Sequence, residues 1–267
     1  MINSTLRRLK QHKLHVLSAL YDVKTRDQRV AKSLDYWRSL KGLHTGRRGF
    51  VIGNGPSLRM GDLECLQDEI SIASNKIYLA FDQVQWRPTY YTICDYLVWL
   101  KIREKVAKHV EKIHIPDYLN GIPLRIRRRV NVWRTLSSKG RNDGLNVFSD
   151  DATNGLAGGG TVTYENVQLA AHLGLNPIYI IGCDHYYSNE FDVKQDVAIK
   201  VVDGSNHFIK GYRKPGEKVA PACFDIMNAA YQSARKYSDE TGVEIFNATR
   251  GGHLEAFKRV DFKAVVQ

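Results

Sequence analysis

The chain has 267 residues, 43% of them hydrophobic, which suits one large α/β domain with room for a tail or an insertion. We expect neither a membrane span nor a secretory leader, because Arg7, Arg8, Lys10 and Lys13 interrupt the apolar residues near the N-terminus. The four cysteines are scattered and form no Cys-x-x-Cys pair, which argues against a disulfide scaffold or a zinc ribbon. These features predict a cytoplasmic protein.

The net charge of +11 is concentrated near the N-terminus. Residues 1–48 hold 12 Lys or Arg and 3 Asp or Glu, a net charge of +9. The other 219 residues hold 27 Lys or Arg and 25 Asp or Glu, a net charge of +2. Apolar side chains recur among these basic residues at roughly helical spacing, at Leu6, Leu9, Val16, Leu17 and Leu20. We therefore expect residues 1–45 to form a basic helical segment. It would bind the anionic inner face of a membrane, or pack on a neighbour or mediate formation of a homo-oligomer. No nucleic-acid reader motif accompanies the charge, so nucleic acid is not an expected partner.

Short runs of β-forming residues alternate with helical patterns over residues 46–267. Strands are expected at 50–52, 70–74, 89–94, 112–115, 177–182 and 243–246, and helices at 96–110, 161–173 and 221–241. This alternation predicts an α/β fold with a doubly wound, mostly parallel, Rossmann-like sheet. Residues 185 to about 218 are polar and without a long period, so we expect them to form an inserted lid.

The first predicted strand ends abruptly in Gly53-Asn54-Gly55, followed by Pro56 and Ser57. Glycines allow a sharp turn and a close approach of the backbone to a ligand, Pro56 suits the first turn of a helix, and Ser57 can cap that turn. The turn is either a loop whose exposed N–H groups hold a phosphate or a sugar, or a plain strand–turn–helix junction. It is neither a Walker loop nor the dinucleotide fingerprint, because it lacks the Gly-Lys-Ser/Thr of the first and the third glycine of the second.

Polar residues follow several other predicted strands: Asn75, Asp95, Asp184 and Asn247-Ala248-Thr249. Ligands of doubly wound sheets bind outside the carboxyl ends of the strands, where these residues are expected to lie. Asn54 and Asn75 suit sugar or base hydroxyls, although Asx turns also place Asn at such positions. The turn Gly158-Gly159-Gly160 before Thr161 opens a helix, so it either presents backbone donors to an anion or is a loop with unusual φ values.

Two stretches contain residues suited to acid–base chemistry. In Asp184-His185-Tyr186-Tyr187 a tyrosine hydroxyl can donate to a leaving phosphate, with aromatic packing as the alternative. His207 lies in the polar insertion, where an imidazole can act as the base for an acceptor hydroxyl or have no special role. Lys210 and Arg213 follow it and either hold phosphate or are solvated surface charges.

Together these motifs resemble the bacterial sialyltransferases of the Campylobacter type, over about residues 49–255. The resemblance rests on Gly53–Leu58, Ser74–Tyr78, Ile178–Asp184, Tyr186 and Ser205–Ile209. The same outline is shared by a broader group, which includes proteins similar to the archaeal hydroxymethylpterin diphosphokinase and the motility accessory factors. Gly159–Tyr164 and Asn247–Gly252 resemble that broader group more closely.

The sialyltransferase resemblance implies transfer of an acidic sugar, a sialic acid or a related nonulosonic acid, from a CMP-activated donor to a surface glycan or a lipid-linked precursor, without a metal. It implies that Asn54 and Asn75 contact the CMP-sugar, that Tyr186 donates to the departing phosphate, and that His207 deprotonates the acceptor hydroxyl. The further donor-binding candidates are Gly53, Gly55, Ser57, Asp95, Gly160, Thr161, Asp184, Tyr187, Lys210 and Arg213. The sialyltransferases carry an Arg before the helix that begins here near Thr161, where this chain has three glycines, so Lys210 or Arg213 would have to stabilise the phosphate.

Two other functions fit the same motifs. A pyrophosphokinase similar to the pterin enzyme would use ATP and Mg²⁺, with Asp95 and Asp184 as metal ligands. A non-catalytic protein would bind a nucleotide or a glycan and take part in polysaccharide assembly through its basic N-terminal segment.

Overall fold

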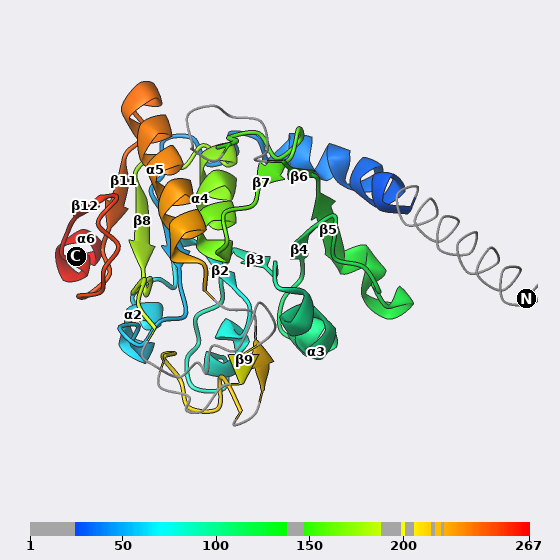
Figure 1. Ribbon diagram of the computed structural model, residues 1–267, viewed down its shortest axis with the longest axis horizontal. Coiled ribbons are helices and arrows are strands. Elements are labelled where there is room, and N and C mark those ends of the chain that lie inside the picture. Colours follow the sequence, from blue (N-terminus) through cyan, green and yellow to red (C-terminus); the bar gives the residue numbers. More distant parts are fainter. Residues whose placement is uncertain (1–24, 138–146, 188–198, 201–205, 215–216, 220–221) are drawn as a thin grey trace, which may run out of the picture.

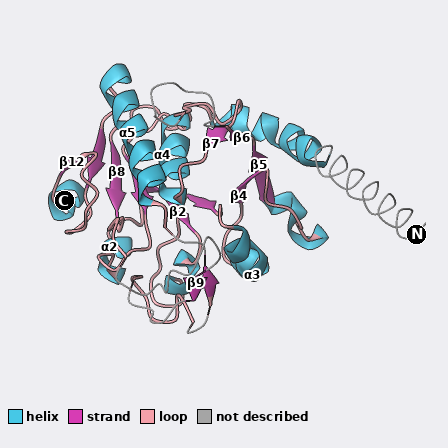
Figure 2. Ribbon diagram, viewed as in Figure 1, coloured by secondary structure: helices cyan, strands magenta, loops and turns pink. Residues whose placement is uncertain are grey.

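The computed structural model describes residues 25–137, 147–187, 199–200, 206–214, 217–219 and 222–267 (Figure 1). Its main sheet has eight strands, each parallel to its neighbours, and helices cover both faces (Figure 2). From one edge to the other the strands are β12 (Lys258–Arg259), β11 (Ile245–Asn247), β8 (Ile178–Ile181), β1 (Gly49–Ile52), β2 (Ile70–Ser74), β3 (Tyr90–Thr92), β4 (Ile113–Pro116) and β5 (Val130–Trp133). The predicted doubly wound, mostly parallel α/β sheet is confirmed.

The remaining elements connect these strands. The helices are residues 25–40, α2 (Met60–Glu64), η1 (Ile77–Ala80), α3 (Tyr96–Val106), η2 (Leu124–Arg129), α4 (Val162–His172), α5 (Phe224–Thr241) and α6 (Phe262–Val266). Two short two-stranded sheets pair β6 (Thr135–Leu136) with β7 (Leu156–Ala157), and β9 (Ile199–Lys200) with β10 (Lys218–Val219).

The side chains of each central strand alternate between two hydrophobic cores. Phe50 and Ile52 of β1 pack in the core that contains side chains of α2, α3 and α6. Val51 packs on the other face with α4 and α5. Because both faces are covered, β1 and β8 are apolar along their whole length instead of alternating with polar residues.

The strand order reverses between β1 and β8. From β1 the chain adds β2 to β5 on one side of the sheet, and then β8, β11 and β12 on the other side. The connections therefore leave β1 and β8 in opposite directions, which opens a crevice outside the carboxyl ends of these two strands. In this class of fold, ligands bind at that position.

The helix of residues 25–40 belongs to the core of the domain. Trp37 is fully buried, and its Nε1 donates to the carbonyl of Val132 in β5 at 2.9 Å. Ser33 Oγ accepts from the Val132 N–H at 2.9 Å, and Arg26 pairs with the buried Asp117 at 2.6 Å. The apolar residues at positions 6 to 20 that suggested membrane binding lie outside the described residues, so membrane binding stays a prediction.

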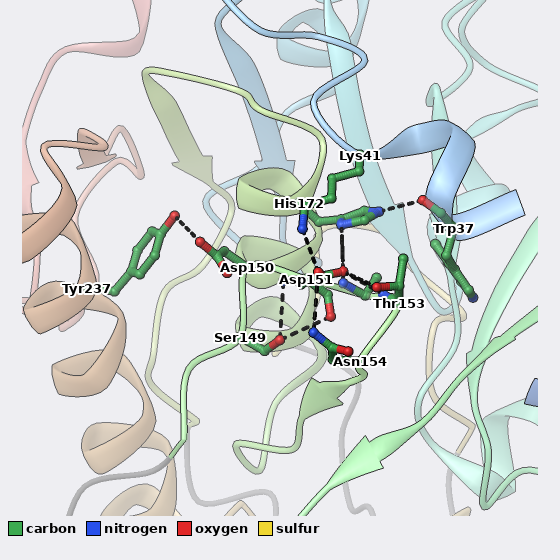
Figure 3. A network of polar contacts seen from close by, with 10 residues as sticks. Trp37, Lys41, Ser149, Asp150, Asp151, Thr153, Asn154, His172 and Tyr237 are labelled. Atoms are coloured by element: carbon green, nitrogen blue, oxygen red, sulfur yellow. Dashed lines mark hydrogen bonds and ion pairs between the residues drawn. The ribbon is translucent and has the colours of Figure 1, made fainter. Parts of the chain in front are cut away.

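A polar network around Asp151 joins this helix to α4 (Figure 3). The Asp151 carboxylate accepts from Thr153 Oγ1 at 2.6 Å and from Lys41 Nζ at 2.5 Å. Burial alone would raise the pKa of Asp151, but the hydrogen bonds from Lys41 and Thr153 outweigh it and hold the pKa at about 2. His172 of α4 donates from Nε2 to the carbonyl of Trp37 at 2.9 Å. None of these residues belongs to the lining of the cavity described below, so we assign the network a structural role.

The elements that the sequence did not predict are short or polar. β5 follows the arginine-rich η2 directly, and β12 consists of two exposed charged residues, so neither has a strong apolar pattern. The helix expected over residues 96–110 ends at Val106 and continues as turns. The helix expected at 221–241 begins at Phe224.

Candidate functional site

A cavity of about 530 Å³ lies at the carboxyl ends of β1, β2, β3 and β8. Its lining includes the turn after β1, the N-terminus of α4, the residues after β8 and part of the predicted lid. The predicted site residues that line it are Gly53, Asn54, Gly55, Asn75, Asp95, Gly160, Thr161, Asp184, Tyr186, Tyr187, His207 and Arg213. Ser57 and the exposed Lys210 do not belong to the lining.

The turn after β1 is held by the end of β8. The Gly53 N–H donates to the carbonyl of Ile181 at 2.8 Å, and the Gly55 N–H donates to the carbonyl of Gly182 at 2.8 Å. A Cβ atom on Gly55 would overlap Asp184 Oδ2, so the close approach that requires glycine is to protein atoms. These two N–H groups are therefore not free for a phosphate, which favours the strand–turn–helix junction for this part of the turn.

Ser57 positions Asp184 and does not cap a helix. Its hydroxyl donates to Asp184 Oδ2 at 2.9 Å, and its N–H donates to the same oxygen at 3.3 Å. Burial raises the pKa of Asp184 against the opposing effect of these hydrogen bonds. The helix expected to begin at Pro56 begins at Met60, because Asp62 Oδ2 accepts from the Arg59 N–H there at 2.9 Å.

Unpaired polar atoms and strained backbone coincide in the cavity. Asn54 donates from Nδ2 to the carbonyl of Ser74 at 3.2 Å, but its Oδ1 is buried without a partner, as is Oδ1 of Asn75. Asn75 and His185 have φ values of 55° and 51°, and they are the non-glycine residues with positive φ in the described ranges. Buried polar atoms without a partner are uncommon, and strained residues concentrate at functional sites. Both features make this cavity the candidate site for a polar ligand.

The residues after β8 are divided between the mouth and the interior of the cavity. Tyr186 is 54% exposed and packs against the ring of His253, with the ring centroids 5.3 Å apart. Tyr187 is more deeply placed, and burial raises the pKa of its hydroxyl. His185 Nε2 hydrogen-bonds Asn228 Oδ1 at 2.7 Å, while its Nδ1 is buried without a partner. Tyr186 therefore lies at the mouth of the cavity, whereas Tyr187 lies deeper.

The N-terminus of α4 forms one wall of the cavity. Thr161 caps the helix by accepting from the Thr163 N–H at 3.3 Å, and Gly160 has a φ of 72°. The positive end of a helix dipole favours an anion at such a position. Asp95 has a structural function as well, because its Oδ1 caps α3 by accepting from the Val98 N–H at 2.9 Å.

Residues 206–214 are a second described part of the predicted lid, and Asn206, His207, Tyr212 and Arg213 line the cavity. The Phe208 N–H donates to the carbonyl of Asn54 at 3.2 Å. His207 stacks on Tyr212 with 3.8 Å between the ring centroids, and its Nδ1 is buried without a partner. Burial, followed by the charges of Arg213 and Lys76, lowers the pKa of His207 to about 3. His207 is thus a neutral imidazole at the edge of the cavity.

A cluster of cations supports this segment, and of its members only Arg213 was predicted from the sequence. Lys76 Nζ donates to the carbonyl of Tyr212 at 2.6 Å and to Glu217 at 3.1 Å. Glu217 also pairs with Lys101 at 3.0 Å and lies 3.6 Å from Arg213. Three cations share one carboxylate, so the cluster has an excess positive charge next to the cavity. The only sequence feature that pointed to Lys76 was its position directly after Asn75.

The wall formed by α4 and by the segments that follow β3 and β4 was also missed. It contains Cys94, Tyr118 and Glu165, all part of the cavity lining. None of these three residues directly follows a predicted strand or belongs to a recognisable motif, so the sequence did not single them out. Glu165 is buried within α4, and this burial raises its pKa to about 8.

The described part of the chain contains two carboxylates that were expected to bind a metal ion, Asp95 and Asp184. No group of three His, Cys, Asp or Glu side chains there is arranged to hold a metal ion. Asp95 and Asp184, the ligands expected for a Mg²⁺-dependent pyrophosphokinase, each have one carboxylate oxygen hydrogen-bonded to the protein.

The comparisons with known proteins give one structural match. No protein-family model and no curated protein matches the chain. The MAf glycosyltransferase from Magnetospirillum magneticum AMB-1 is similar to it, with a TM-score of 0.49 and 16% sequence identity. The match covers 88% of this chain and 39% of that one, so the chain spans less than half the length of its neighbour. The resemblance to Campylobacter-type sialyltransferases stays a prediction. Across the described ranges, no helix is long and apolar enough to cross a membrane.

Proposed function

We propose that the chain is a glycosyltransferase that moves an acidic sugar from a CMP-activated donor to a hydroxyl group of a glycan or a lipid-linked precursor. The observation that carries the proposal is that Asn54, Asn75, Tyr186 and His207, dispersed along the sequence, all line the cavity at the switch point of the sheet. The choice of CMP and of an acidic sugar rests on the sequence resemblance that named these four residues.

The size and the polar groups of the cavity support a nucleotide-sugar ligand. Small-molecule sites enclose about 300–1,000 Å³, and this cavity falls within that range. The unpaired oxygens of Asn54 and Asn75 can accept from sugar hydroxyls or from a base amino group. Arg213 and the N-terminus of α4 supply positive potential for the phosphate. Arg213 thus takes the phosphate role that the resemblance left to Lys210 or Arg213.

His207 is the proposed general base. As the acceptor oxygen attacks the anomeric carbon, its proton passes to the neutral imidazole, and the bond to the phosphate breaks with the electron pair leaving on the phosphate oxygen. Burial and the charges of Arg213 and Lys76 lower the pKa of His207 to about 3. A bound phosphate would offset those two charges and raise this pKa, so His207 becomes a stronger base when the donor is present.

Aromatic side chains at the cavity support a sugar acceptor. Tyr96, Tyr118 and Tyr186 line the cavity and are each about half exposed to solvent. A tyrosine ring offers an apolar face together with a hydroxyl group, and this combination suits the mixed surface of a sugar ring. Tyr186 is proposed to act at this mouth and to donate to the departing phosphate.

The test is transfer of a labelled acidic sugar from its CMP donor by His207 variants. His207→Phe retains an aromatic ring to stack on Tyr212 but cannot accept a proton. We expect its kcat to fall about 10²–10⁴-fold, the usual contribution of general-base catalysis, with a much smaller change in donor affinity. His109→Phe is the matched control, because His109 is exposed and outside the cavity lining. Wild-type transfer by His207→Phe would rule out this mechanism.

A further inference from the structure

One buried carboxyl group in the cavity has no part in the mechanism above. Glu165 lies in the first turn of α4, is 7% exposed and lines the cavity. Its Oε2 is buried without a hydrogen-bond partner, and no cation in the described residues offsets the burial of its charge. A carboxyl group with an unused hydrogen-bonding atom facing a ligand cavity is suited to contact the ligand.

The neighbours of Glu165 favour its neutral form. Cys94 at the end of β3 and Tyr118 after β4 interact electrostatically with Glu165. The carboxylate of Asp95 raises the pKa of the same two residues. All three would be neutral or negative at neutral pH. Burial raises the pKa of Glu165 to about 8, so its carboxyl group carries a proton at pH 7. The Tyr118 hydroxyl donates its hydrogen to the carbonyl of Cys94 at 2.7 Å, so it has no hydrogen left to stabilise a Glu165 carboxylate.

The position of Glu165 places this proton beside the anion site. A Cβ atom on Gly158 would lie 3.8 Å from Glu165 Oε1, so the carboxyl group borders the glycine turn that precedes α4. Gly158, Gly160 and Thr161 line the cavity together with Glu165. A phosphate at the helix N-terminus would attract a protonated carboxyl group as a donor and would be repelled by a carboxylate.

We propose that Glu165 binds the phosphate of the ligand as a neutral hydrogen-bond donor at the N-terminus of α4, and that ionisation of Glu165 releases the phosphate. This inference depends on the proposed function only in that the ligand carries a phosphate. It identifies Glu165 as a binding residue that sets the upper pH limit of ligand binding.

The test measures binding of CMP and of sulfate to the full chain by calorimetry between about pH 7 and pH 9.5. Sulfate has the shape of a phosphate, and its charge is constant over this range. We expect the wild-type affinity to fall about tenfold for each pH unit above 8, as required when one proton must be retained for binding. In Glu165→Gln the amide group donates at every pH. Its affinity should therefore change less than about twofold over this range, apart from any loss of positive charge at Lys76, which the wild type would share. Glu64→Gln, an exposed substitution on α2, should follow the wild type.

Carbon-13 NMR of the wild-type glutamate carboxyl groups gives a readout that needs no variant. One carboxyl group should titrate near pH 8, and saturating sulfate should move this midpoint upward, because the ligand binds the protonated form. Absence of such a group, a downward movement, a pH-independent wild-type affinity, or no binding of either ligand would overturn the inference. Pronounced pH dependence with sulfate but no binding of CMP would support the inference and contradict the nucleotide donor of the proposed function.

Discussion

Substituting Gly55 by Ala tests how the turn after β1 is held. The added methyl group would overlap Asp184 Oδ2 and lie 2.9 Å from Asp184 Cγ and from the carbonyl oxygen of Gly182. The carboxylate would have to move away and lose its bonds from the Ser57 hydroxyl at 2.9 Å and N–H at 3.3 Å. Hydrogen bonds to charged groups contribute about 1.5–3 kcal/mol, and the longer bond is the weaker. We therefore expect the free energy of unfolding to fall by about 2–4 kcal/mol.

Gly61→Ala is the matched control. Gly61 lies in α2 with no atom within 4 Å of an added Cβ, so alanine should stabilise the helix by about 0.5–1 kcal/mol. Urea denaturation of both variants gives the midpoints and slopes that separate stability from a change in the unfolded state. Equal midpoints for Gly55→Ala and Gly61→Ala would refute the packing of the turn against Asp184.

Three further predictions concern the N-terminal helix and its polar network. Trp37→Ala should lower the free energy of unfolding by about 3–5 kcal/mol in denaturant titrations, because Trp37 is fully buried; a loss below about 1 kcal/mol would contradict its core position. The pKa of Asp151, about 2, lies below its ordinary 3.8, so its ionisation stabilises the fold above about pH 4 and this stabilisation is lost as the pH falls through 2. Asp151→Asn should therefore unfold at a lower temperature at pH 7 and show a weaker acid dependence, and an unchanged pH profile would contradict this. Deleting residues 1–24 leaves Trp37 in place and should abolish co-sedimentation with anionic liposomes; equal sedimentation of both chains would refute membrane binding by this segment.

The sheet could be predicted because its central strands are buried on both faces. Such strands are short apolar runs ending in glycine or a polar residue, as at Ile52–Gly53 and Ile181–Gly182, and this pattern is visible in one sequence. The edge strand β12 has no such pattern, because its two charged residues are held by pairing with β11. The sequence alone could not decide the role of the turn after β1, because Gly53 and Gly55 are approached by Gly182 and Asp184, which are distant in the sequence.

The residues of the candidate site could be predicted where they come soon after the end of a strand. Asn54, Asn75 and Asp184 could be located in this way, because the carboxyl ends of parallel strands share one edge of the sheet. Glu165 and Lys76 could not, because their importance depends on burial and on partners contributed by other elements. A glutamate within a helical pattern reads as a surface residue until the helix is placed against the sheet.

The central claim is that the cavity binds a CMP-activated donor, and a thermal-shift panel tests it most directly. The panel compares CMP, CDP, UDP, GDP and ATP, each with and without Mg²⁺, since a ligand that binds the folded state raises the melting temperature by mass action. We predict that CMP gives the largest shift, that Mg²⁺ does not change it, and that Asn54→Ala reduces it. The largest shift with ATP and Mg²⁺, or no shift with CMP, would contradict the account.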